Sequence, residues 1–107
     1  MLGVSEATLR DEGVFSAACA SEMATGAQRA LGVDWAVSVT GVAGPGGGSE
    51  ANPVGTVYFG WASPKGVVTE RKRFRGDRGR VQSRAVTYAL FKLLQLITRS
   101  AQEGSTP

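Results

Sequence analysis

The chain has 107 residues, which fits one small domain or part of one and leaves no room for two. Its hydrophobic fraction of 42% and charged fraction of 20% are those of an ordinary soluble globular protein, and no apolar run approaches the roughly 20 residues that span a bilayer. The net charge is +3, histidine is absent and Cys19 is the single cysteine, so the sequence excludes Ser-His-Asp and Cys-His catalysis, predicts no metal site and suits a reducing cytoplasm.

The first third of the chain predicts helix. Ser5 is placed to cap a short helix that ends near Gly13. Ser16 caps a second, alanine-rich helix over 17–31, and Gly32 is placed to end it in the left-handed conformation. Residues spaced four apart predict the buried stripe of this helix: Cys19, Met23, Ala27 and Leu31.

The middle of the chain predicts three strands. Residues 35–40 are β-branched and apolar on both faces, which is typical of a buried strand with neighbours on both sides. After a glycine-rich loop over 41–53, the segments 54–61 and 67–74 predict a hairpin with a turn at 63–66. The last strand carries four consecutive charged residues, so we expect it at a sheet edge.

The last third predicts one long helix over 78–99, capped by Asp77, and a frayed polar tail over 101–107. Its 3.6-residue stripe consists of Val81, Ala85, Ala89, Leu93, Leu94 and Ile97. The order of elements predicts an α/β domain over 1–100. The strand over 35–40 is apolar on both faces, and this domain offers few strands to pair with it and few helices to cover it. We therefore expect an incomplete core.

The loop after the first strand is the most informative segment. Thr40–Ser49 leaves the end of a buried strand, where open α/β sheets bind ligands. Its successive glycines allow backbone N–H groups to converge on an anion such as phosphate or carboxylate. The spacing G-x-x-G-x-G, followed by a strand, fits neither a P-loop nor a dinucleotide fingerprint. A crossover loop without a ligand is the competing interpretation.

The amino-acid sequence of this loop resembles that of a known family. The segments 37–48 and 52–58 are similar to the signature of the CinA C-terminal domain family (competence/damage-inducible proteins). Flanking matches at 2–5, 13–16 and 74–78 lie in the same order. The resemblance covers residues 1 to about 98. It implies a three-layer α/β/α fold from which the family's first helix and first strand are missing.

The resemblance further implies a cofactor-free nicotinamide-nucleotide amidohydrolase of pyridine-nucleotide salvage, which converts nicotinamide mononucleotide and water to nicotinic acid mononucleotide and ammonia. The family's catalytic serine, tyrosine and lysine belong to motifs that precede the matched segment, so no catalytic residue is assigned here and we expect the isolated chain to be inactive. Lost burial predicts self-association into a homo-oligomer. The predicted substrate-binding residues are Thr40, Gly41, Gly44, Pro45, Gly46, Gly47, Gly48 and Arg78.

Basic residues gather in 65–80, which holds seven cations against Glu70 and Asp77. A solvated edge that blocks strand pairing is the first interpretation of this run. Phosphate binding by Arg78 and nucleic-acid binding are the others, although we expect no nucleic acid or membrane partner. For the whole chain, the alternatives to a partial amidohydrolase are a non-catalytic nucleotide- or phosphate-binding or oligomerisation module and a basic nucleic-acid-binding protein.

Overall fold

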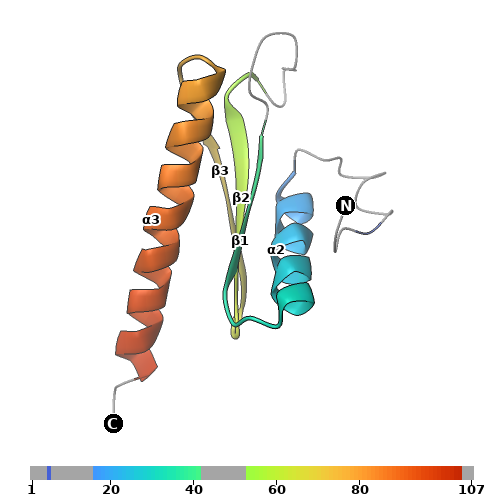
Figure 1. Ribbon diagram of the computed structural model, residues 1–107, viewed down its shortest axis with the longest axis vertical. Coiled ribbons are helices and arrows are strands. Elements are labelled where there is room, and N and C mark those ends of the chain that lie inside the picture. The colour runs from blue at the N-terminus through green and yellow to red at the C-terminus, as the bar shows by residue number, and fades with distance from the viewer. Residues whose placement is uncertain (1–4, 6–15, 42–52, 105–107) are drawn as a thin grey trace.

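The computed structural model describes residues 5, 16–41 and 53–104, so the short helix expected between Ser5 and Gly13 lies outside the described residues. In chain order the elements are α2 (Ala17–Leu31), β1 (Ala36–Gly41), β2 (Thr56–Ser63), β3 (Gly66–Arg73) and α3 (Arg78–Gly104). The two helices lie against opposite faces of the sheet (Figure 1), which confirms the α/β/α layering. No helix within the described ranges has the length and apolar character needed to cross a membrane.

The sheet is antiparallel with the order β1-β2-β3. Phe59 at its centre stands opposite Val39 on one side and Glu70 on the other. The charged strand β3 lies at an edge, as predicted. The strand β1, expected between two neighbours, also lies at an edge, because β2 is its one pairing partner among the described strands.

The helix α2 has the predicted bounds and caps. The hydroxyl of Ser16 accepts a hydrogen bond from the Cys19 amide at 3.1 Å, and Gly32 ends the helix at φ 62°. Its buried face is Cys19, Ala20 and Ala24, whereas Leu31 of the expected stripe is 72% exposed. The predicted stripe was correct at Cys19, while Met23 and Ala27 are half-buried and Leu31 was wrong. Small side chains let the helix backbone lie directly on β2, and Leu31 at the end of the helix extends past this contact.

Backbone contact between α2 and the sheet centres on Gly60. A Cβ atom at this position would lie 2.4 Å from the carbonyl oxygen of Ala20. The hydroxyl of Ser38 donates a hydrogen bond to the same oxygen at 2.5 Å. Glycine is therefore required at the centre of β2 for the first helix to sit at its observed distance.

The opposite face of β2 forms the main core with α3. Phe59 and Trp61 stack with ring centroids 5.4 Å apart, and the indole N–H of Trp61 donates to the carbonyl of Ala89 at 3.1 Å. The buried members of this core are Val57, Phe59, Trp61, Val81, Ala85 and Ala89.

The predicted stripe of α3 was correct at its start and wrong towards its end. Leu94 is 65% exposed and Ile97 is 37% exposed, while Leu96 packs against the core in their place. The helix also continues to Gly104 instead of ending near Arg99. Its remaining apolar residues lie on a flank that no described segment covers.

Replacing Gly60 with alanine should destabilise the fold by about 1–3 kcal/mol, because the new methyl group forces α2 away from the sheet. The matched control is Gly79→Ala in the first turns of α3, where the nearest atom to an added Cβ is 3.6 Å away. That variant should be neutral or more stable by up to about 1 kcal/mol. Urea unfolding followed by circular dichroism compares them, and equal stabilities would contradict the close contact.

Candidate functional site

The functional candidate is the end of the sheet from which the glycine-rich loop departs. The strand β1 ends there at Gly41, and the chain returns through Pro53 to the start of β2. Figure 1 shows that the N-termini of α2 and α3 both point towards this end. Each helix N-terminus carries partial positive charge, so each favours a negative charge at this end of the sheet, on its own face.

The last residues of β1 pack closely against the first residues of β2. A Cβ atom at Gly41 would lie 3.0 Å from both the carbonyl oxygen of Thr56 and a methyl group of Val57. Thr40 is buried on the face that also carries Ser38, the face covered by α2. The loop therefore begins from a tightly packed corner.

One buried hydroxyl at this corner is unsatisfied. The side chain of Thr56 is fully buried, and within the described part of the chain its Oγ1 atom has no hydrogen-bond partner. Burying a hydroxyl without a partner costs about 1–3 kcal/mol. This cost falls on the first residue of β2, directly beside the point where the loop leaves Gly41.

The return of the chain into β2 is fixed by a glycine. Gly55 has φ 93°, and a Cβ atom on it would lie 2.1 Å from the carbonyl oxygen of Phe74. The Phe74 amide donates to the Gly55 carbonyl at 2.9 Å, and the Arg73 guanidinium donates to the Val54 carbonyl at 3.2 Å. These contacts connect the segment that leads from β3 into α3 with the segment where the glycine-rich loop re-enters the sheet.

The start of α3 combines a negative cap with exposed cations. Asp77 accepts a hydrogen bond from the Arg80 amide at 2.9 Å, and Arg84 donates to the Arg75 carbonyl at 2.7 Å. Arg78 is the first residue of the helix and is exposed, and the first turn contains no acidic residue. A cation at a helix N-terminus is unfavourable by itself, whereas a bound anion would be stabilised by both the helix and the arginine.

Of the predicted substrate-binding residues, the structure brings three to this end. Thr40 faces the α2 side, Gly41 ends β1, and Arg78 begins α3 on the other side of the sheet. Gly44, Pro45, Gly46, Gly47 and Gly48 lie outside the described residues. An apolar cleft of about 220 Å³ opens beside Gly41; its lining residues are Val39, Gly41, Val57, Val81, Gln82, Ala85 and Val86.

The basic residues of β3 make contacts within the protein. The guanidinium of Arg71 lies 6.0 Å from the ring centre of Tyr58, and the amine of Lys72 lies 4.1 Å from that of Tyr88. Such cation–π contacts hold the charged groups against the sheet. They favour the interpretation of this run as a charged, protective sheet edge.

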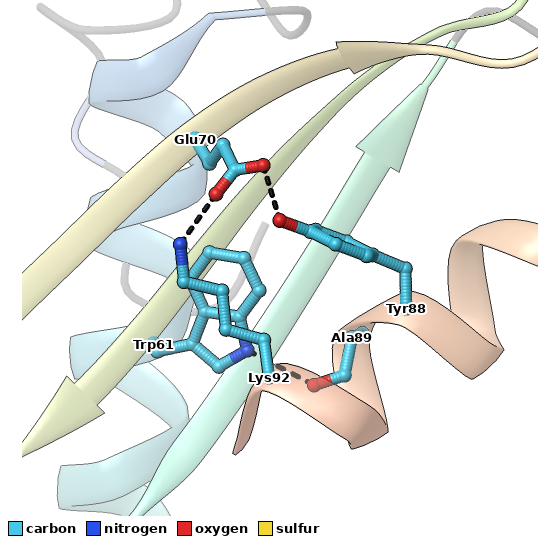
Figure 2. Close-up of polar contacts among 5 residues, drawn as sticks. All are labelled: Trp61, Glu70, Tyr88, Ala89 and Lys92. Atoms are coloured by element: carbon cyan, nitrogen blue, oxygen red, sulfur yellow. Dashed lines mark hydrogen bonds and ion pairs between the residues drawn. The ribbon is translucent and has the colours of Figure 1, made fainter. Parts of the chain in front are cut away.

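A second polar cluster, which sequence reasoning missed, joins β3 to α3. Figure 2 shows the carboxylate of Glu70 accepting hydrogen bonds from the Tyr88 hydroxyl and the Lys92 amine. Lys92 also lies 4.8 Å from the ring centre of Trp61. The available signal was the spacing of Tyr88 and Lys92, four residues apart on one helix face. Their common partner on a distant strand is visible only in the fold.

The cluster shifts two pKa values in opposite directions. Burial alone would raise the pKa of Glu70, but the hydrogen bonds from Lys92 and Tyr88 and the attraction of Lys92 and Lys72 outweigh burial and lower it. Burial, and then the hydrogen bond to Glu70 and its charge, raise the pKa of Tyr88 to about 12. Tyr88 therefore remains protonated at neutral pH and is unsuited to act as a base, so the cluster fastens α3 to the sheet.

The thiol of Cys19 and the possible metal ligands are the other chemical groups to consider among the described residues. Cys19 is fully buried, and burial followed by the nearby charge of Glu22 raises the pKa of its thiol, which keeps it protonated and unreactive. Among residues 5, 16–41 and 53–104, no three histidine, cysteine, aspartate or glutamate side chains gather as metal ligands would.

The Glu70 cluster predicts a pH dependence of stability. The lowered pKa of Glu70 means that its contribution is present above its ordinary value of 4.5 and is lost as the pH falls through the folded value. The raised pKa of Tyr88 means that its contribution is present below its ordinary value of 10.0 and is lost towards about 12. Unfolding free energies measured from pH 3 to 12 should decline at both ends.

Variants separate these two effects. Glu70→Gln should reduce stability at neutral pH by roughly 1–2 kcal/mol and remove part of the acid decline, and Tyr88→Phe should remove part of the alkaline decline. Asp34→Asn, at an exposed turn, is the control for loss of a carboxylate. An acid decline that Glu70→Gln and Asp34→Asn alter equally would show that the cluster does not fasten the helix.

Comparisons with known proteins identify the family of the chain. Residues 1–97 match the family described as the CinA C-terminal domain. The nicotinamide-nucleotide amidohydrolase PncC of Escherichia coli (strain K12) is 49% identical over 96 residues, which cover 89% of this chain and 58% of that protein. A CinA-like protein of Microcystis aeruginosa (strain NIES-843) is 49% identical over 88 residues, or 81% of this chain and 21% of that protein.

Solved structures show the same fold. The competence damage-inducible protein A of Klebsiella pneumoniae superposes with a TM-score of 0.85 at 39% identity, over 91% of this chain and 60% of that chain. The competence/damage inducible protein CihA of Agrobacterium tumefaciens gives 0.84 at 39% identity, over 90% and 59%. The present chain thus spans about three fifths of the PncC relative and of these two structures.

Proposed function

The chain belongs to the CinA C-terminal domain family, and we propose that it forms the nucleotide-binding part of a nicotinamide-nucleotide amidohydrolase. The observation that carries the proposal is the loop corner, where the glycine-rich segment leaves Gly41 between the N-termini of α2 and α3. The PncC relative, 49% identical, has a name that states the activity. The substrate follows from that activity: nicotinamide mononucleotide, which carries one phosphate.

The phosphate group of this substrate fits the electrostatics of the corner. The N-terminus of α3, together with the exposed guanidinium of Arg78, supplies positive charge, and the guanidinium also supplies hydrogen-bond donors. The glycines Gly44, Gly46, Gly47 and Gly48 would add backbone N–H donors from the loop, and Pro45, which has no N–H, would restrict the loop backbone between them. Thr40 and Gly41 would fix where the loop begins.

The hydrolytic groups of the reaction would come from outside these residues. The family's catalysis rests on a serine hydroxyl activated by a lysine and assisted by a tyrosine, in motifs that precede the matched segment. The lysines of the described part are otherwise engaged: Lys92 pairs with Glu70, Lys72 lies over Tyr88, and Lys65 lies in the β2–β3 turn. We therefore propose binding as the role of this chain and assign it no catalytic residue.

The setting of the protein is part of the same proposal. A role in pyridine-nucleotide salvage in the cytoplasm belongs to this proposal, and the buried free thiol of Cys19 is compatible with a reducing compartment. The exposed apolar residues of α3 support self-association.

Titration calorimetry tests the binding role. Nicotinamide mononucleotide should bind the chain, and nicotinamide riboside, which lacks the phosphate, should bind at least about tenfold more weakly. Arg78→Ala should abolish most of that difference, because the arginine acts on the phosphate. Arg99→Ala, near the opposite end of α3, is the matched control and should leave both affinities unchanged. Equal binding of the nucleotide and the riboside by the unaltered chain would contradict the proposal.

The purified chain should release no ammonia from nicotinamide mononucleotide above the rate of a blank without protein. Ammonia release is measured by a coupled assay over several hours. Turnover by the chain alone would overturn the assignment of catalysis to groups outside it. Binding that persists without turnover when the remaining family motifs are supplied on the same polypeptide would favour the non-catalytic module.

A further inference from the structure

Hydroxyl groups gather on the face of the sheet that α2 covers. Within the described ranges, the buried polar side chains all carry hydroxyls: Ser16, Ser38, Thr40 and Thr56. Ser16 caps α2, and Ser38 of β1 donates to the Ala20 carbonyl of the same helix. Thr40 lies two residues further along β1, on the same side of the strand. Buried hydroxyls cost free energy unless they find partners, so their partners show what this face is built to hold.

The side chain of Thr56 points to this face. A Cβ atom at Gly60 would lie against the Ala20 carbonyl, so Gly60 faces α2. Side chains alternate along a strand, so Thr56 also faces α2, whereas Val57 belongs to the core beneath α3. The Thr56 hydroxyl is shut off from water and has no hydrogen-bond partner in the described part of the chain. It is therefore a buried polar group whose bonding capacity the fold leaves unused.

The N-terminus of α2 points towards the same corner. The helix runs alongside the strands, and from the Gly60–Ala20 contact both β2 and α2 lead back to the loop end of the sheet (Figure 1). Four residues span about 13 Å in a strand and about 6 Å in a helix, so Thr56 lies beyond Ser16 at that end. The first turn of α2 contains no acidic residue, so its partial positive charge has no carboxylate of its own to offset it.

Arg73 brings a full positive charge to the same place. It stands directly opposite Thr56 in the register of β2 and β3, so both side chains share the α2 face. Its Nε atom donates to the Val54 carbonyl at 3.2 Å, which holds the exposed guanidinium at the corner. A guanidinium has two further nitrogens, and their planar arrangement matches two oxygens of a phosphate or carboxylate group.

We propose that Thr56, Arg73 and the N-terminus of α2 form a subsite for an oxyanion, a phosphate or a carboxylate group, on the α2 face of the loop corner. The Thr56 hydroxyl donates to one oxygen and the guanidinium to another, while the helix stabilises the charge. The bound oxygen recovers the free energy that the unsatisfied hydroxyl costs. Arg78 begins α3 on the other face, so this subsite does not depend on the phosphate contact proposed for Arg78.

Urea unfolding tests whether the hydroxyl is unused by the fold. Thr56→Val keeps the shape of the side chain and removes the unsatisfied group, so its unfolding midpoint should shift to a higher urea concentration. Thr69→Val, exposed on β3, is the control for the same substitution in a strand and should shift the midpoint less. Ser38→Ala removes a hydroxyl that is bonded to Ala20 and should lower the midpoint. A Thr56→Val midpoint no higher than that of the unaltered chain would overturn the proposal.

Amide chemical shifts of residues 17–19 measure anion binding at the start of α2. Inorganic phosphate and nicotinate are titrated separately, and the anion that gives saturable shifts identifies the group that the subsite takes. Thr56→Val and Arg73→Gln should each raise the dissociation constant about tenfold. Thr56→Ser retains the hydroxyl and should bind as the unaltered chain does. Arg71→Gln, the matched control, removes the same charge from a side chain held over Tyr58 and should also leave binding unchanged.

The outcomes that would contradict the subsite are separate from those that bear on the nucleotide. Absence of saturable shifts at residues 17–19 with both anions would overturn it. Equal weakening by Arg71→Gln and Arg73→Gln would reduce the effect to net charge and would also overturn it. Shifts that are lost in Arg78→Ala but kept in Thr56→Val would place the anion on the α3 face instead. Failure of nicotinamide mononucleotide to bind would count against the proposed function and not against this subsite.

Discussion

The fold depends on the central strand β2, because each of its faces holds one helix. On one face Gly60 allows the backbone of α2 to touch the sheet, and Ser38 of β1 bonds to the same carbonyl. On the other face Phe59 and Trp61 form the apolar base on which α3 rests. The positions of both helix N-termini at the end of the sheet where β1 ends and β2 begins follow from these two contacts.

Local chemistry made much of this predictable from sequence. Ser16 and Gly32 define the ends of α2 because capping is decided by neighbouring residues. The face that α2 buries was not predictable, since it depends on a glycine in a strand about forty residues further along the chain. The Glu70 cluster was missed for the same reason: β3 and α3 become neighbours only after the sheet has formed.

The candidate site was also predictable from the sequence only in part. The sequence of the loop identified the family, which the comparisons confirm. The fold places Gly41 and Arg78 at one end of the sheet. The sequence did not predict that Thr40 would face α2 while Arg78 begins the helix on the other face. The apolar cleft beside Gly41 is lined by residues of β1, β2 and α3, so it lies on the face of the sheet that α3 covers.

We propose that this chain binds a phosphate-bearing nucleotide at the loop corner without performing the hydrolysis. The most direct measurement is a map of amide chemical shifts during titration with nicotinamide mononucleotide. We predict that the largest changes occur at Gly41, Thr56 and residues 78–80, with little change at Lys65 in the opposite turn. Changes concentrated around Lys65, or their absence at saturating nucleotide, would contradict the claim.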